Sequence, residues 1–420
     1  MLSAAFGKGG DRKNNGPVHK SSQTHPNKQG GKTRLKMNCR FSLYIALCLI
    51  LMISSFALAG CGGEKKPAAP AAPQTIKLGF VGPLTGASAQ DGESMRRGTE
   101  LAIEIANAAG GVGGKKIELA AADDKSDPKE AAAIANKFIA DASILAVVGN
   151  YNSSCTLAGA PIYNKAGLIQ VSPGSSSPAV SNAGPFTFRT ITTDAFQGKY
   201  LINWAVKDEK FKNIAVVYEN TDYGQGLLKV IEAEAPVLGA KIVAKEAYLL
   251  GETKDFSAVV SKVKAAKPDV IIVGGLYNET ALFAKQAIKN ELKVPMMGVD
   301  GLYSDALIKL GGEAVEGLKL TAFFHVSSPS KETQNFIAAY KKKYNEEPGT
   351  YAAYAFDAAS IVIEAMSKGK AERKAIKEYV TPLKGFKGAT GVIDFDANGD
   401  RIGTALKLIV KGGKFQVLDK

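Results

Sequence analysis

The sequence predicts an α/β protein of two doubly wound lobes, each built on a parallel sheet. Short apolar runs alternate with stretches of helical periodicity, which is typical of βαβ units. This alternation occurs twice, in residues 76–171 and again in residues 213–289. The folded part has about 345 residues, too many for one ordinary core. Ligands bind outside the carboxyl ends of the strands in such sheets, so a cleft between two lobes would collect several binding loops.

The first run predicts strands at residues 76–81, 117–121, 144–148 and 168–171. Apolar residues at helical spacing begin near Met95, and the glycines of residues 110–114 end that helix. Asp127 then starts a second helix, because a capping residue is followed by Pro128 in the first turn and by Glu130 at the third position.

The second run repeats this pattern. It predicts strands at 213–218, 240–248 and 270–273, with helices at 224–235, 256–266 and 279–289. Its glycines and those of the first run do not predict a nucleotide cofactor. Residues 79–82 lack the G-x-G-x-x-G spacing, residues 110–114 follow a helix instead of a strand, and no Walker sequence occurs.

The N-terminal part predicts export and lipid attachment. Basic residues precede an apolar run at 41–57, which ends in Leu58-Ala59-Gly60-Cys61 and resembles the bacterial lipobox. This resemblance implies that Cys61 is diacylated and becomes the mature N-terminus. The alternative is a transmembrane anchor that carries a cysteine, although about 17 residues are at the lower limit for a span. Residues 1–60 are therefore expected to be an extension plus a lipoprotein signal peptide.

Two features flank this signal. Residues 61–74 are rich in Ala and Pro, so we expect a stiff, extended tether. Residues 1–36 fit no part of a signal, whereas Met37 begins a compact one. Either Met37 is the true start or the chain has a long polar n-region.

Charge and composition exclude several classes of function. Of the net charge of +13, residues 1–60 carry +8, and the remaining +5 without basic-aromatic runs does not indicate nucleic-acid binding. Only Cys155 lies in the folded part, which excludes an internal disulfide. With His325 as its one histidine, a zinc site or a histidine-based triad is not expected. An enzyme of doubly wound fold would need a nucleophile–base pair or a cofactor loop, and neither is found.

Several short motifs, in their order and spacing, resemble the leucine/isoleucine/valine-binding proteins of ABC importers, of the periplasmic binding protein type I class. They are residues 79–86, Asp123-Asp124, Arg189 with Asp194 and Gln197-Gly198, and residues 222–226. The resemblance extends from about Thr75 to Val417 and implies two Rossmann-like lobes joined by three hinge crossings. It places the first lobe at 75–194 and 324–390, and the second at 195–323 and 391–420. The disulfide usual in the family is absent, because Ser126 and Asn152 stand at the corresponding positions.

The resemblance implies a set of ligand-binding residues. Ser153 corresponds to the serine that holds the ligand carboxylate, and Asn152 precedes it in the same loop. The residues support this assignment independently, because residues 149–154 open a helix whose unpaired N–H groups favour an anion. The alternative is that Ser153 or Ser154 only caps the helix.

The remaining positions complete the implied site. By the resemblance, Ser176 also binds the carboxylate, and the carbonyl of Gly174 accepts from the ammonium; the alternative for this stretch is an ordinary turn. The side chain of Asp300 also binds the ammonium, and the alternative is an acid in a solvated loop. The resemblance also implies that three residues form the wall of the pocket: Tyr223, Leu276 and Tyr351. The alternative is that each only packs in the core. Asp91 replaces an aromatic residue that covers the ligand side chain in branched-chain binders, and this admits a polar or other small amino acid.

Together these observations predict an extracytoplasmic, lipid-anchored monomer in the cell envelope, not an enzyme. It would bind a small amino acid, with the branched-chain type favoured, and deliver it to an ABC permease and ATPase without a cofactor or metal. Two alternatives remain: a binding protein for another small carboxylate or amide, and a ligand sensor of the same fold.

Overall fold

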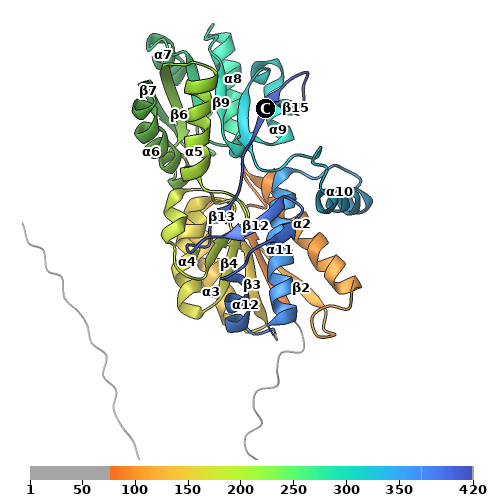
Figure 1. Cartoon of the computed structure of the whole chain (residues 1–420). Helices are drawn as coiled ribbons and strands as arrows, with labels where there is room; N and C mark the ends of the chain where they lie inside the picture. Colours follow the sequence, from red (N-terminus) through yellow and green to blue (C-terminus); the bar gives the residue numbers. More distant parts are fainter. Residues whose placement is uncertain (1–75, 370, 419–420) are drawn as a thin grey trace, which may run out of the picture. The chain divides into compact units, whose positions relative to one another are not determined.

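The computed structural model describes residues 76–369 and 371–418, so the predicted signal peptide, Cys61 and the tether lie outside the described residues. The described chain forms two α/β lobes (Figure 1), as predicted. The residue numbers at which the chain was predicted to cross between the lobes remain predictions.

The first lobe contains a parallel sheet in the order β2-β1-β3-β4-β5. Its strands are β1 Ile76–Gly82, β2 Ile117–Asp123, β3 Ile144–Gly149, β4 Ile169–Ser172 and β5 Thr187–Arg189. The connections are α2 Ala89–Ala108, α3 Pro128–Ala140, α4 Ser153–Ala166 and the short η1 Pro178–Asn182. The helix predicted from Asp127 is confirmed: the Asp127 side chain accepts from the backbone N–H of Lys129, and Pro128 is the first helical residue.

Both faces of this sheet are covered. Leu78 and Phe80 of β1 point into a core shared with α2 and with the later helices α10 Lys331–Tyr344, α11 Thr350–Lys368 and α12 Arg373–Val380. Val81 points the other way, into a smaller core with α3 and α4. Because alternate residues of a strand face opposite sides, a strand covered on both faces is apolar throughout.

The second lobe contains a sheet in the order β15-β14-β10-β9-β8-β6-β7. Its parallel strands are β6 Asn213–Glu219, β7 Lys241–Tyr248, β8 Val270–Gly274, β9 Met296–Gly298 and β10 Lys319–Ala322. Two antiparallel strands at one end of the sheet, β14 Leu406–Val410 and the edge strand β15 Phe415–Val417, make this sheet mixed rather than purely parallel.

Helices cover this second sheet as well. They are α5 Asp194–Asn203, continued by the π-helical η2 Trp204–Asp208, then α6 Asp222–Val237, α7 Ser257–Ala265, α8 Tyr277–Lys289 and α9 Asp305–Gly311, with short η3 Asp300–Leu302 and η4 Gly312–Val315. Ile214 and Val216 of β6 pack toward α6, whereas Ala215 and Val217 pack toward α7, α8 and α9.

A small third sheet contains β11 Phe386–Gly388, β12 Gly391–Phe395 and β13 Arg401–Ile402. Arg401 ties it to the first lobe, because its guanidinium donates to the carbonyl of Thr190, just after β5, at 2.9 Å. The same nitrogen also donates to the hydroxyl of Thr390 within the small sheet. The chain then continues into β14 of the second sheet.

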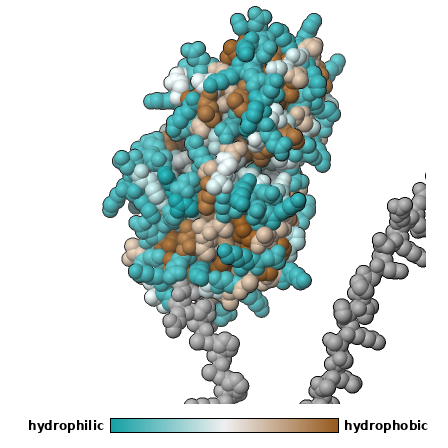
Figure 2. Space-filling model, turned by 180° about the vertical axis from the view of Figure 1, so that it is seen from behind, coloured by the Kyte–Doolittle hydropathy of each residue, from teal (hydrophilic) through white to brown (hydrophobic). Residues whose placement is uncertain are grey.

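The surface seen from the back is mostly hydrophilic, with hydrophobic residues in separate groups on both lobes (Figure 2). None of the helices in the described part of the chain combines the length and apolar character needed to cross a bilayer.

Candidate functional site

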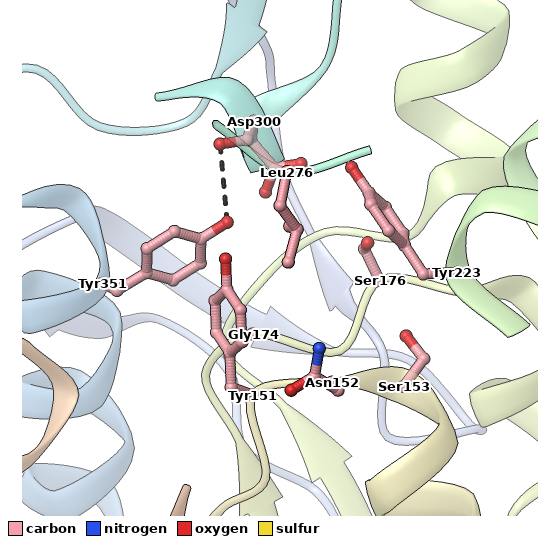
Figure 3. A pocket seen from close by; sticks show the side chains of 9 residues that line it. All are labelled: Tyr151, Asn152, Ser153, Gly174, Ser176, Tyr223, Leu276, Asp300 and Tyr351. Atoms are coloured by element: carbon pink, nitrogen blue, oxygen red, sulfur yellow. Dashed lines mark hydrogen bonds between the residues drawn. The ribbon is translucent and has the colours of Figure 1, made fainter. Parts of the chain in front are cut away.

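A small cavity of about 10 Å³, room for about one water molecule, lies where loops at the carboxyl ends of strands from the two sheets meet. Figure 3 shows the side chains that line it. They are Tyr151, Asn152, Ser153, Gly174, Ser176, Tyr223, Leu276, Asp300 and Tyr351. Every site residue predicted from the sequence is in this set except Asp91, and the structure adds Tyr151.

The loop after β3 presents a helix N-terminus to the cavity. Helix α4 begins at Ser153, whose side chain is buried and whose hydroxyl accepts from the backbone N–H of Ser177 at 3.2 Å. The side chain of Asn152 makes no capping bond, and its buried Oδ1 has no partner. The first-turn N–H groups of a helix lack intrahelical acceptors and carry partial positive charge, so this loop favours an anion.

The loop after β4 lies beside it. Ser176 is buried, and its hydroxyl donates to Asp194 Oδ2 at 3.0 Å. Gly174 packs on Tyr151 so closely that an added Cβ would lie 2.7 Å from the ring, which is why only glycine fits there. Arg189 fixes the backbone of this loop, because Nη1 donates to the carbonyls of Ser175 at 3.1 Å and Ser177 at 2.9 Å.

Across the cavity lies a buried carboxyl group, that of Asp300, at the start of η3. Its Oδ1 accepts from Gln197 Nε2 at 2.7 Å, and its Oδ2 has no partner. Burial raises the pKa of Asp300 to about 6. Gln197 also donates to Asp194, whose pKa is raised to about 7 by burial and by the charge of Asp300.

The wall residues come from both lobes. The hydroxyl of Tyr223, at the start of α6, is buried without a partner. Leu276 lies just before α8 and points into the cavity between the tyrosines (Figure 3). Tyr351, in the first turn of α11, donates to the carbonyl of Asp300 at 3.4 Å.

Asp91 lies behind the wall instead of in it. It is buried in the first turn of α2 and accepts from the hydroxyl of Tyr151 at 2.7 Å. Burial raises the pKa of Asp91 to about 7. The sequence had suggested that Asp91 faces the ligand, but Tyr151 stands between Asp91 and the cavity. Tyr151 could have been suspected, because it is the bulky residue of the loop that contains Asn152 and Ser153.

This arrangement suits a zwitterion. A helix N-terminus with serine hydroxyls faces a carboxylate, and three buried polar atoms at the cavity lack partners: Asn152 Oδ1, Tyr223 Oη and Asp300 Oδ2. Buried polar groups are normally hydrogen-bonded, so these three atoms have bonding capacity left for a polar molecule in the cavity. Within the described residues no group of three or more His, Cys, Asp or Glu side chains is placed to hold a metal ion.

Two α/β lobes with a polar cavity between their strand ends define a two-lobed binding protein. Residues 75–410 match the family model described as periplasmic binding protein, and the chain belongs to this family. The predicted resemblance to substrate-binding proteins of branched-chain amino-acid ABC transporters is confirmed, and with it the prediction that the protein is not an enzyme.

Relatives and solved structures agree. Leu/Ile/Val-binding protein homolog 2 of Brucella abortus is 33% identical over 364 residues, which cover 86% of this chain and 93% of the relative. A leucine-, isoleucine-, valine-, threonine- and alanine-binding protein of Pseudomonas aeruginosa is 32% identical, with 83% and 92% covered. The branched-chain amino-acid transporter substrate-binding protein of Streptococcus pneumoniae, solved with isoleucine, superposes with a TM-score of 0.77 at 31% identity, covering 82% of this chain and 99% of its own.

Proposed function

We propose that this protein binds an amino acid between its lobes and delivers it to an ABC importer. One observation carries the proposal: one side of the cavity favours a negative group and the opposite side favours a positive group. The N-terminus of α4 lies on one side, and the unpaired Oδ2 of Asp300 lies on the other. The names of the relatives favour the branched-chain class, and one relative also binds threonine and alanine.

The α-carboxylate would lie at the first turn of α4, where backbone N–H groups and the hydroxyl of Ser153 donate to it, with Ser176 beside it. The ammonium would lie between Asp300 and the carbonyl of Gly174. A desolvated ammonium needs an opposite charge, and the burial of Asp300 strengthens that attraction.

Removing the negative charge of Asp300 tests this pose. Asp300→Asn keeps the shape and an acceptor for Gln197 but leaves a buried ammonium without a counter-charge. We expect a loss of about 2–5 kcal/mol, roughly 30- to several-thousand-fold in affinity. Ser153→Ala should lose only about 1–2 kcal/mol, because the backbone N–H groups remain. The matched control is Asp305→Asn, an exposed carboxylate on α9.

Isothermal titration calorimetry with the twenty amino acids and their des-amino analogues gives the readout. A des-amino acid should bind the wild type poorly and lose little more in Asp300→Asn. If Asp300→Asn binds amino acids as tightly as the wild type, the ammonium role is wrong. A small carboxylate or a neutral amide is then the better ligand class.

Anchoring is a separate part of the proposal. The run Leu58-Ala59-Gly60-Cys61 supports lipid attachment at Cys61, which would hold the protein on the outer side of the cytoplasmic membrane or in the periplasm. Cys61→Ala should release the protein from the membrane fraction and abolish its labelling with a fatty-acid probe. A wild-type protein that is recovered unacylated would contradict this part alone.

Delivery distinguishes a transport receptor from a sensor of the same fold. The protein, expected to act as a monomer, should stimulate the ATPase activity of a reconstituted permease–ATPase complex in the presence of its amino acid. Failure to stimulate any importer encoded beside its gene would favour the sensor.

A further inference from the structure

The side-chain end of the cavity is formed by the rings of Tyr151 and Tyr351. Once the carboxylate and ammonium of an amino acid are assigned to Ser153 and Asp300, the remaining wall consists of these two rings, Leu276 and Tyr223. Tyr223 lies on the side of Ser153 and Ser176 (Figure 3). Figure 3 shows both rings on the side of the cavity away from Ser153. The ligand side chain would therefore point toward them.

Three contacts restrain the side chain of Tyr151. Its hydroxyl donates to Asp91 at 2.7 Å, its ring meets Tyr351 edge-to-face at a centroid distance of 4.9 Å, and the backbone of Gly174 packs against it. Tyr351 is held in turn by its bond to the carbonyl of Asp300. Neither ring can swing aside without losing one of these contacts.

The bond to Asp91 ties the hydroxyl of Tyr151 to a buried carboxyl group. Asp91 is 4% exposed, and the hydroxyl of Tyr151 is the donor that reaches its Oδ2. Rotation of Tyr151 would leave a buried carboxyl group short of a donor, which is costly. Asp91 thus acts on the pocket through Tyr151.

We propose that Tyr151, positioned by Asp91, shortens the pocket, so that the protein prefers amino acids with small side chains, such as alanine and serine, over leucine and isoleucine. This inference rests on the proposed function. Two bulky rings that are each held in place leave little length at this end, and a small side chain requires less displacement of the rings than a branched one.

The ranking of ligands by the wild-type protein is the first test. Isothermal titration should show alanine or serine binding at least about tenfold more tightly than leucine. If leucine binds as tightly as alanine or more tightly, the size inference is overturned while the proposed function stands. If no amino acid binds, the proposed function fails, and this inference falls with it.

Variants test the roles of the two residues. Tyr151→Ala should improve leucine relative to alanine by about tenfold or more, because space opens at the side-chain end. Asp91→Ala should also improve the affinity for leucine relative to alanine. Asp91→Asn should keep the wild-type ratio of these affinities, because its amide oxygen can still accept from Tyr151. Tyr344→Phe, on α10 and outside the pocket, is the matched control.

The ratio of the two affinities separates specificity from folding, because general destabilisation weakens both ligands together. Thermal unfolding of each variant checks that it is folded. A leucine-to-alanine ratio that is the same in Asp91→Ala and in Tyr344→Phe would overturn the positioning role of Asp91.

Discussion

The guanidinium of Arg189 is fully buried and donates from Nε to the carboxylate of Asp400 at 2.6 Å. Asp400 lies in the turn between β12 and β13, whereas Arg189 ends β5. Ser181 completes the arrangement, because it accepts from Arg189 Nη2 at 2.6 Å and donates to Asp400 at 2.7 Å. The same guanidinium holds the carbonyls on either side of Ser176, so the small third sheet is linked to the candidate site.

The first prediction is that Asp400→Ala destabilises the protein and weakens ligand binding. Loss of one partner of a buried ion pair leaves the other charge uncompensated, which costs about 3–5 kcal/mol. Affinity should fall as well, because Arg189 then positions the Ser176 loop less well. Denaturant unfolding and titration measure the two effects. Glu232→Ala breaks the exposed pair with Lys245 and should change stability by less than about 1 kcal/mol; an equal effect of both changes would contradict the prediction.

Direct hydrogen bonds join the two lobes. The carbonyl of Ala87, between β1 and α2, accepts from Tyr277 Oη at 3.2 Å and from Asn278 Nδ2 at the start of α8. On the other side of the cavity Ser177 donates to the carbonyl of Asp222 at 2.9 Å. These bonds stabilise closure without contacting the ligand.

The second prediction is that Asn278→Ala shifts the equilibrium toward the open form. Loss of one hydrogen bond costs about 0.5–1.5 kcal/mol, so affinity should fall roughly two- to tenfold. The change should appear mainly as faster dissociation, measured by stopped-flow fluorescence, because the bond forms after the ligand enters. Asn290→Ala, exposed at the end of the same helix, is the control. Small-angle scattering that is unchanged by ligand in the wild type would exclude hinge closure altogether.

The third prediction concerns the pH dependence of stability. Burial raises the pKa of several carboxyl groups: Glu219 to about 8, Asp91 and Asp194 to about 7, and Asp300 to about 6. Between about pH 4 and pH 8 the folded protein therefore binds more protons than the unfolded chain. Without ligand, the free energy of unfolding should decrease as pH rises through this window.

Glu219→Gln isolates one of these groups outside the cavity. Its Oε1 accepts from the hydroxyl of Thr221 at 2.6 Å, and its Oε2 has no partner. The substitution should reduce the loss of stability between pH 5 and pH 8 by an amount on the order of a few kcal/mol. Denaturant unfolding at both pH values gives the measurement. The exposed Glu252→Gln should leave the pH dependence as in the wild type, and an identical curve for Glu219→Gln would refute the assignment.

Most of the fold could be predicted because its causes are local. Strands buried on both faces form continuous apolar runs, and caps such as Asp127 mark the starts of helices. The strand β5, the π-helical turn of η2 and the individual strands and helices after Lys289, such as β14 and β15, were not predicted. β14 and β15 are short and only partly buried, so their apolar pattern is weak, and π-helical turns have no clear sequence pattern.

Most of the residues that line the cavity could be predicted, and the exceptions are Tyr151 and the place of Asp91. The resemblance implied Ser153 and Ser176, which lie in the loops after β3 and β4, and the structure brings them to one cavity. Asp91 and Tyr151 are 60 positions apart in the sequence, and the hydrogen bond from the hydroxyl of Tyr151 to Asp91 forms only in the folded lobe. Nothing local in the sequence specifies such a pair, so Asp91 was expected to face the ligand and Tyr151 was missed.

The last prediction is that amino-acid affinity decreases at acid pH through Asp300. Burial raises the pKa of this carboxyl group to about 6, and a protonated carboxyl offers no charge to an ammonium. Gln197 bonds Oδ1 in either protonation state, so the change concerns the charge at Oδ2, which faces the cavity. The nearby Asp194, with its pKa of about 7, protonates first on acidification and so reduces the repulsion on Asp300.

Affinity should therefore be nearly constant from pH 8 to about pH 6 and then decrease toward a limiting slope of about tenfold per pH unit, as expected for one proton competing with one ammonium. Asp300→Asn should be weak at every pH and should show no such decrease. Titration calorimetry in buffers of different ionisation enthalpy also counts the protons released on binding, with release expected near pH 5.5. If the wild type and Asp300→Asn show parallel pH profiles, another group controls the dependence, and the pairing of Asp300 with the ammonium loses its support.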